Sequence, residues 1–85
     1  MYTVVITEYA IRQLKKVNRQ MVAKLRESIT PLATDPRPYN HIKLTNVEAY
    51  RIRVGNYRIV YEIKDNVLTV TVIEVSDSKE TYRKK

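Results

Sequence analysis

The sequence predicts an α+β fold in which an N-terminal strand and a two-helix hairpin precede a three-stranded antiparallel meander, with the helices on one face of the sheet. Three observations support this prediction. Apolar residues recur every three or four positions between residues 11 and 32, which is typical of amphipathic helices. From residue 50 onward apolar and polar residues alternate, which is typical of half-buried strands. The pair Gly55-Asn56 separates two alternating runs and predicts a hairpin turn.

The N-terminal half is predicted to hold one strand and two helices. Residues 2–6 are β-branched or aromatic and indicate a strand. Thr7 and Asn18 can each cap the start of a helix, because their side chains accept a free backbone N–H. Pro31 predicts that the second helix kinks or ends near Thr30, because proline lacks the N–H that the helix needs. The apolar stripes are Ile11, Leu14 and Val17 in the first helix and Met21, Leu25, Ile29 and Leu32 in the second.

The C-terminal half is predicted to form strands over residues 50–54, 57–64 and 67–75, joined by the two-residue turns Gly55-Asn56 and Asp65-Asn66. With both turns at two residues, the alternation agrees in all three strands and fixes the register. One face is then the predicted core, formed by Ile52, Val54, Ile59, Tyr61, Ile63, Leu68, Val70 and Val72.

The opposite face of the meander carries the strongest functional signal in the sequence. In the predicted register Arg53 faces Arg58 across the strands, and Arg51 lies two residues along on the same face. Like charges placed opposite one another destabilise a sheet, so the pairing indicates an anion that is bound part of the time. A guanidinium fork suits the oxygens of a phosphate. The alternative is a solvated face with Glu48 and Glu62 as partial counterions.

Composition narrows the class of protein. The 85 residues predict a single domain over 1–85, and 16 Lys+Arg against 9 Asp+Glu give a net charge of +7, which favours polyanions or an acidic protein as partners. The absence of cysteine argues against a disulfide scaffold and fits the cytoplasm. The lone His41 predicts no metal site, and the single glycine leaves no phosphate-cradling loop. The apolar run of residues 1–7 is too short for a signal peptide or a membrane span.

The aromatic residues are seven tyrosines. Tyr61, on the predicted core face, is expected to be buried with its hydroxyl tethered to a polar partner. Tyr82 follows the last strand, between Lys79 and Arg83, and such a neighbourhood can stack a splayed base and hold its phosphate. The alternative is a frayed basic tail.

The run from Tyr50 to Ile63, Tyr-Arg-Ile-Arg-Val-Gly-Asn-Tyr-Arg-Ile-Val-Tyr-Glu-Ile, resembles the hallmark run of the RelE/ParE superfamily, the toxins of type II toxin–antitoxin modules. Lys43-Leu44, the proline-rich turn after Asp35 and the tail Glu80-Thr81-Tyr82-Arg83 extend the resemblance over essentially the full length. It implies the same strand, helical hairpin and meander. It also implies a cytoplasmic toxin with a cognate antitoxin, which contacts operator DNA only through that antitoxin.

Within the superfamily, RelE-like members cleave messenger RNA in the ribosomal A site, whereas ParE-like members inhibit DNA gyrase. The RelE-like function is favoured here: an mRNA interferase that stops translation. It would be an endoribonuclease without metal or cofactor, in which the 2′-hydroxyl of the substrate attacks the scissile phosphate. The resemblance implies catalytic roles for Arg51, Arg53, Arg58 and Tyr82, and substrate binding by Lys43, Lys79 and Arg83.

Two departures from the family pattern bear on mechanism. Arg51 and Arg53 stand where the best-known member has lysines, and an arginine cannot lose its proton to act as a base. The family's C-terminal arginine is missing here, unless Lys79 replaces it as a cation of less selective geometry. The general base and acid therefore remain open, and we expect weak catalysis. The alternatives are a ParE-like gyrase inhibitor without catalysis and a degenerate member that binds only antitoxin or RNA.

Overall fold

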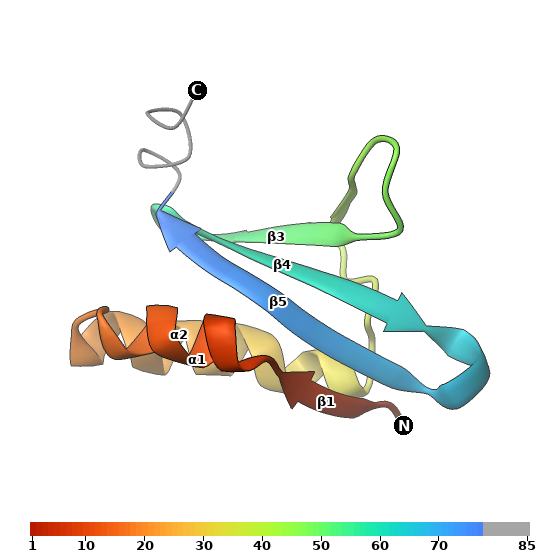
Figure 1. The fold of residues 1–85 in the computed structure, drawn as a ribbon, viewed down its shortest axis with the longest axis horizontal. Coiled ribbons are helices and arrows are strands. Elements are labelled where there is room, and N and C mark those ends of the chain that lie inside the picture. Colours follow the sequence, from red (N-terminus) through yellow and green to blue (C-terminus); the bar gives the residue numbers. More distant parts are fainter. Residues whose placement is uncertain (78–85) are drawn as a thin grey trace.

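The computed structural model describes residues 1–77 and confirms the predicted α+β class. Two helices lie on one face of a five-stranded mixed sheet, in which β1 runs parallel to its neighbour β5 and the other strand pairs are antiparallel (Figure 1). The spatial order of strands is β1-β5-β4-β3-β2. The elements are β1 (Thr3–Ile6), α1 (Glu8–Lys15), α2 (Arg19–Ile29), β2 (Ile42–Lys43), β3 (Tyr50–Val54), β4 (Tyr57–Lys64) and β5 (Thr69–Asp77).

Both helices begin where the sequence predicts. The hydroxyl of Thr7 accepts a hydrogen bond from the backbone N–H of Ala10 at 3.2 Å, and the side chain of Asn18 accepts one from Met21 at 2.9 Å. Each such cap contributes about 1 kcal/mol. The predicted effect of Pro31 is also confirmed, because α2 ends at Ile29 and the chain continues as a short 3₁₀ helix over Thr30–Ala33.

The apolar stripe predicted for α1 is confirmed at Leu14 and Val17, which pack against the core, and is wrong at Ile11. Ala10 is fully buried, whereas Ile11 is 39% exposed. Ala10 and Leu14, four residues apart, lie on the face of the helix that packs on the core, and Ile11 lies at the edge of that face. The stripe predicted for α2 is confirmed, with Leu25, Ile29 and Leu32 buried and Met21 packed against the core.

The first hairpin has the predicted register. Val54 pairs with Tyr57 and Ile52 with Ile59 around the Gly55-Asn56 turn. Gly55 has a φ of +60°, a conformation that favours glycine, and a Cβ at this position would lie 3.1 Å from the Cε of Met21. The turn is therefore packed directly on the beginning of α2.

The predicted register of the second hairpin is wrong. Instead of a two-residue turn, the chain forms a 3₁₀ helix over Asp65–Val67, followed by Leu68 in the left-handed region with φ 46°. Ile63 consequently pairs with Val70 and not with Leu68, which is 49% exposed. A slip of two residues keeps the side chains of residues 69–72 on their predicted faces, so Val70 and Val72 remain in the core although Leu68 does not join them.

Beyond Val72, a β-bulge reverses the face of the sheet on which each side chain of β5 lies. Tyr61 pairs with Val72, but its neighbour Val60 pairs with Glu74, which leaves Ile73 as the extra residue of β5. The alternation is shifted by one from there on. Val75 becomes a core residue, 2% exposed, and Glu74 lies on the opposite face.

The sheet also has more strands than predicted, because β2 adds a two-residue edge beside β3 to the expected four. Neither helix of residues 1–77 is long and apolar enough to cross a membrane. The core lies between the helices and the sheet and consists of Ala10, Leu25, Ile29, Leu32, Tyr50, Ile52, Ile59, Tyr61, Val70, Val72 and Val75.

Candidate functional site

Three arginines lie together on the face of the sheet that the helices leave uncovered. Arg53 pairs directly with Arg58 across β3 and β4, as predicted, and Arg51 is two residues along β3. Their neighbours Ile52 and Ile59 are buried in the core, so the arginine side chains point to the open face. We refer to Arg51, Arg53 and Arg58 as the arginine strip.

The charge of the arginine strip is not neutralised within the described part of the chain. No carboxylate of residues 1–77 forms an ion pair with any of the three arginines. Arg58 is half-buried, and its Nε–H is buried without a hydrogen-bond acceptor among these residues. An unsatisfied buried donor on a charged group is costly, about 1–3 kcal/mol or more. An oxyanion on this face can remove that cost, which makes Arg58 the centre of a candidate anion site.

Two glutamates share the open face with the arginine strip. Glu62, on β4, pairs with Thr71, and Glu74, on β5, pairs with Val60. Glu74 was not among the predicted site residues, because the predicted turn and uninterrupted alternation place it on the helix side. The β-bulge that brings it to the open face has no marker in the alternation of the sequence.

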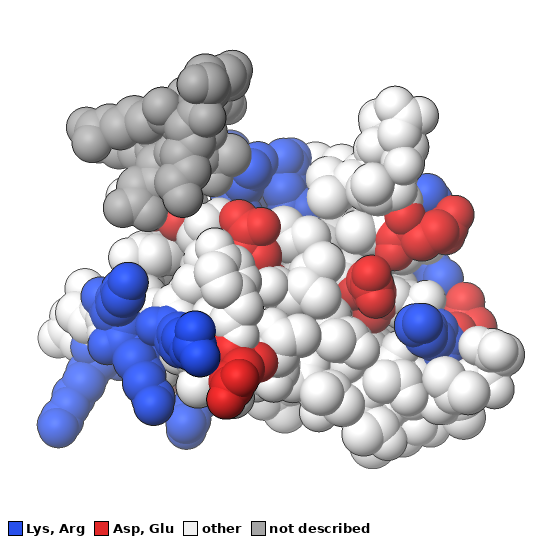
Figure 2. All heavy atoms as spheres, viewed as in Figure 1, with Lys and Arg blue, Asp and Glu red and all other residues white. Residues whose placement is uncertain are grey.

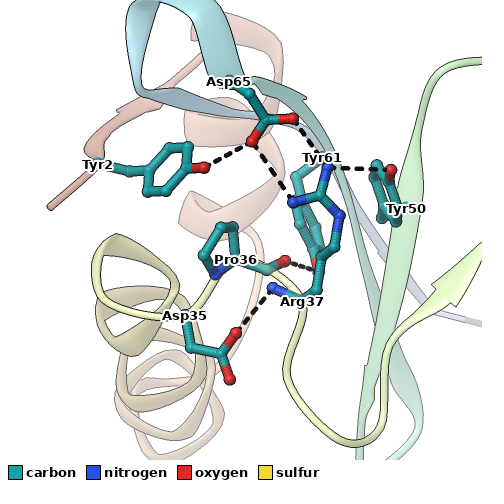
Figure 3. Close-up of polar contacts among 7 residues, drawn as sticks. All are labelled: Tyr2, Asp35, Pro36, Arg37, Tyr50, Tyr61 and Asp65. Atoms are coloured by element: carbon teal, nitrogen blue, oxygen red, sulfur yellow. Dashed lines mark hydrogen bonds and ion pairs between the residues drawn. The ribbon is translucent and has the colours of Figure 1, made fainter.

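A fourth arginine, Arg37, lies on the helix side of the sheet and is fully engaged (Figure 3). Its Nη2 is 3.0 Å from Oδ2 of Asp65 and 3.4 Å from the hydroxyl of Tyr50, and its guanidinium carbon is 5.2 Å from the centre of the Tyr50 ring. Tyr2 donates its hydroxyl to Oδ1 of Asp65 at 2.5 Å. We refer to Arg37, Asp65, Tyr2 and Tyr50 as the Arg37 cluster.

The Arg37 cluster changes the acidity of its members. The hydrogen bond from Arg37, followed by the one from Tyr2, lowers the pKa of Asp65 below its usual value. The same contact with Asp65 raises the pKa of Arg37, and the hydrogen bond to Asp65 raises the pKa of Tyr2. Through the carboxylate of Asp65 the cluster thus joins the residue that precedes β1, the segment after the helices and the β4–β5 turn.

Tyr61 connects the Arg37 cluster to the hydrophobic core. It is fully buried and donates its hydroxyl to the carbonyl oxygen of Pro36 at 2.8 Å, as the predicted tethered hydroxyl requires. Burial raises its pKa to about 12. Its ring stacks on Tyr50 with centroids 5.9 Å apart. Tyr61 and Tyr50 therefore anchor the segment around Pro36 and Arg37 to the sheet.

The other predicted site residues are not brought to the arginine strip by the described structure. Lys43 pairs with Tyr50, and its Nζ is 6.0 Å from the centre of that ring, so it lies on the helix side of the sheet. Tyr82, Lys79 and Arg83 lie outside the described residues. His41 has its Nδ1 2.7 Å from the carbonyl oxygen of Pro38, and residues 1–77 contain no group of side chains suited to a metal ion.

A second group of cations lies at the junction of the two helices. Figure 2 shows lysines and arginines gathered where α1 meets α2, and the exposed members there are Arg12, Lys15, Lys16 and Arg19. Arg12 is within 4.0 Å of Glu8 one turn earlier. These side chains are spread over a solvated helix surface, unlike the arginine strip, where cations are opposed across strands.

Comparison with known proteins identifies relatives of the chain. The family model described as the ParE toxin of type II toxin–antitoxin systems, parDE, matches residues 4–82. No curated protein sequence matches. The structure resembles the RelBE2 toxin–antitoxin complex of Mycobacterium tuberculosis with 29% identity and a TM-score of 0.81, over 89% of this chain and 96% of that one.

Two further structures have the same fold. A chain of the intact RelBE toxin–antitoxin complex of E. coli has 26% identity and a TM-score of 0.79, over 91% of this chain and 96% of that one. A chain of the archaeal RelE–RelB complex of Pyrococcus horikoshii has 22% identity and a TM-score of 0.80, over 89% and 93%. At 22% identity the last match bears on the fold alone.

Proposed function

The chain belongs to the ParE toxin family, within the RelE/ParE superfamily of type II toxin–antitoxin toxins, and we propose that it cleaves messenger RNA in the ribosomal A site. The observation that carries this proposal is the arginine strip. Within residues 1–77 its cations face one another without a carboxylate in an ion pair with them, and the Nε–H of Arg58 lacks an acceptor there. A transition state with a doubly charged phosphate supplies the missing charge.

In the proposed reaction the 2′-oxygen of the nucleotide before the scissile bond attacks phosphorus. A bond forms between the 2′-oxygen and phosphorus, the bond to the 5′-oxygen breaks, and the products are a 2′,3′-cyclic phosphate and a 5′-hydroxyl. Arg53 and Arg58 grip the phosphate oxygens as charge builds on them, and electrostatic stabilisation of this kind commonly contributes more to catalysis than any other single effect. Arg51 adds to the positive field beside them. Tyr82 is proposed to stack the base.

Weaker roles are proposed for the remaining cations. Lys79 and Arg83, next to Tyr82 in sequence, are proposed to hold flanking phosphates. Lys43 has no part in the proposed site, because it lies on the helix side of the sheet. No metal or cofactor enters the reaction, since the nucleophile belongs to the substrate.

We also propose that a cognate antitoxin silences this toxin by bringing acidic residues to the arginine strip. RelE-type chains of the similar structures are in complexes with an antitoxin. The net charge of +7 supplies the complementary field.

The second candidate is inhibition of DNA gyrase without chemistry. The family model that matches residues 4–82 carries the ParE name, and the arginine strip offers no lysine that could act as a base. On this alternative the strip binds gyrase or its DNA.

Inducible expression in bacteria separates the two candidates. We expect cuts at fixed codon positions in translated messages, mapped by primer extension, and none in messages that lack a start codon. The Arg53→Ala, Arg58→Ala double variant is the matched control and should give no cuts. Intact messages together with DNA breaks or blocked supercoiling would support the gyrase candidate and contradict the nuclease proposal.

A further inference from the structure

We propose that Glu74 is the general base of the cleavage reaction, taking the proton from the 2′-hydroxyl of the substrate while the arginine strip holds the phosphate. This inference rests on the proposed nuclease function. It assigns a proton acceptor to a site whose predicted residues are all cations or a phenol.

The β-bulge is what places Glu74 on the face of the arginine strip. Without the extra residue Ile73, strict alternation from Val72 would direct Glu74 into the core. With it, Val75 takes the core position at 2% exposure, and Glu74 pairs with Val60. The backbone N–H of Val75 donates to Oε1 of Gln13 on α1 at 2.6 Å. This hydrogen bond ties β5 to the helix just after the bulge.

The register sets the distance between Glu74 and the phosphate-gripping arginine. Arg58 pairs with Ser76, so Glu74 is its diagonal neighbour on β5. Diagonal neighbours in an antiparallel pair are about 7–8 Å apart at the backbone, within reach of two long side chains with a small group between them. A phosphate on Arg58 therefore presents its adjacent 2′-hydroxyl within the reach of Glu74.

Glu74 is also chemically available. It forms no ion pair within residues 1–77 and is half-buried. The charged side chains that share its face on the neighbouring strand β4 are Arg58, Glu62 and Lys64, the last at the far end of the strand. A glutamate in direct contact with Arg58 would act as its counterion, whereas here a substrate phosphate can enter between them.

The proton balance of the step is complete. The carboxylate of Glu74 accepts the 2′-hydroxyl proton as the 2′-oxygen bonds to phosphorus. The bond from phosphorus to the 5′-oxygen breaks, and the 5′-oxygen takes a proton from solvent water. Glu74 then returns its proton to solvent. Neither Arg53 nor Arg58 can accept a proton at any working pH.

Glu62 provides a matched control on the same face. It is four residues from Arg58 along β4, about 13 Å at the rise of a strand, so it does not reach a phosphate held there. Both glutamates are half-buried and face away from the core. Glu74→Gln and Glu62→Gln therefore make the same change in charge and volume at two distances from the site.

The test is single-turnover cleavage of messenger RNA on programmed ribosomes over a range of pH. We expect Glu74→Gln to lower the rate about 10²–10⁴-fold with ribosome binding unchanged, and to remove the fall in rate that protonation of a base causes at low pH. Glu74→Asp should recover part of the rate. Glu62→Gln should stay within a few-fold of the parent, and thermal melts should show both glutamine variants folded.

The possible failures are distinguishable. If the parent cleaves and Glu74→Gln cleaves at the same rate with the same pH profile, the assignment of Glu74 is wrong and the nuclease function stands. If Glu74→Gln cleaves faster, Glu74 only opposes the negative substrate, and the assignment is equally wrong. If the parent itself does not cleave, the proposed function fails and the role of Glu74 fails with it.

Discussion

The Arg37 cluster and the arginine strip place the same kind of side chain in opposite settings on the two faces of one sheet. Arg37 has a carboxylate, a phenol and an aromatic ring as partners (Figure 3). Arg58 is opposed by another arginine and has a buried Nε–H without an acceptor in residues 1–77. Removing Arg37 should therefore cost stability, and removing Arg58 should cost activity while relieving repulsion. The role of each arginine therefore follows from the side chains that surround it, because the charge is the same in both settings.

The largest effect is expected at the arginine strip. Arg58→Ala and Arg53→Ala should each lower the single-turnover cleavage rate about 10²–10³-fold, because each removes a donor to the phosphate in the transition state. Ribosome binding should weaken far less. Arg58→Lys should recover only part of the rate, since a point charge cannot replace a two-pronged contact. The stability of Arg58→Ala should match or exceed that of the parent in urea titrations.

Arg37→Gln is the control that tests the comparison itself. It should cleave at the parent rate after a small loss of stability, because Arg37 lies on the other face of the sheet. Cleavage that falls as far for Arg37→Gln as for Arg58→Ala would contradict the division between the two regions.

The salt dependence of the association rate with an antitoxin should distinguish the arginine strip from the Arg37 cluster. If acidic residues of the antitoxin approach the arginine strip, the association rate should fall about tenfold or more between low and physiological ionic strength. The double variant Arg51→Ala, Arg53→Ala should reduce both the rate and its salt dependence, whereas Arg37→Gln should leave both unchanged. Stopped-flow mixing measures these rates, and a rate that does not change with salt would contradict the proposed contact.

The first hairpin shows how much of the candidate site the sequence could predict. Gly55-Asn56 allows a two-residue turn with positive φ, and the alternation on both sides agrees with it, so the pairing of Arg53 with Arg58 follows. Both signals are local. They involve residues within a few positions of the turn, and no distant contact overrides them.

The second hairpin and the Arg37 cluster show why the rest could not be predicted. Asp65-Asn66 also suits a short turn, but the chain adds Val67 and a leucine with positive φ, for which the sequence has no marker. The bulge at Ile73 is stabilised by Gln13, from a helix 62 positions away from Val75. The Arg37 cluster likewise joins segments that only the finished fold brings together.

A smaller effect is expected from Tyr61→Phe. The change removes the hydroxyl that donates to the buried carbonyl of Pro36 and should lower the free energy of unfolding by about 1–2 kcal/mol. Cleavage should be retained, because the arginine strip is on the other face. Urea titrations measure the loss, with Tyr39→Phe, at a fully exposed tyrosine, as the control.

Tyr61 also predicts a loss of stability in alkali. Its pKa is raised from 10.0 to about 12 in the folded chain, so the folded state holds the phenol proton more tightly. The resulting stability is complete below pH 10 and is lost as the pH rises from about 10 to about 12. Tyr61→Phe should lose less stability than the parent over this interval in thermal melts, and equal losses would contradict the prediction.

The smallest effect is expected at Asp65, in acid. Its pKa is lowered in the folded state by the hydrogen bond from Arg37 first and by that from Tyr2 second, so the folded state favours the carboxylate. The stability from this group is present above the unfolded pKa of about 3.9 and is lost as the pH falls through the lower folded value.

Asp65→Asn should therefore flatten the stability curve below about pH 4, and Arg37→Gln should flatten most of the same region because it removes the larger cause. Both side chains are substantially exposed, at 39% and 57%, so the change is small and should shrink further in high salt. Denaturant titrations between about pH 2 and pH 5 check this, with Glu62→Gln on the opposite face as the control. An acid-dependent loss that persists unchanged in Asp65→Asn would place the titrating group elsewhere and would remove the electrostatic account of the Arg37 cluster.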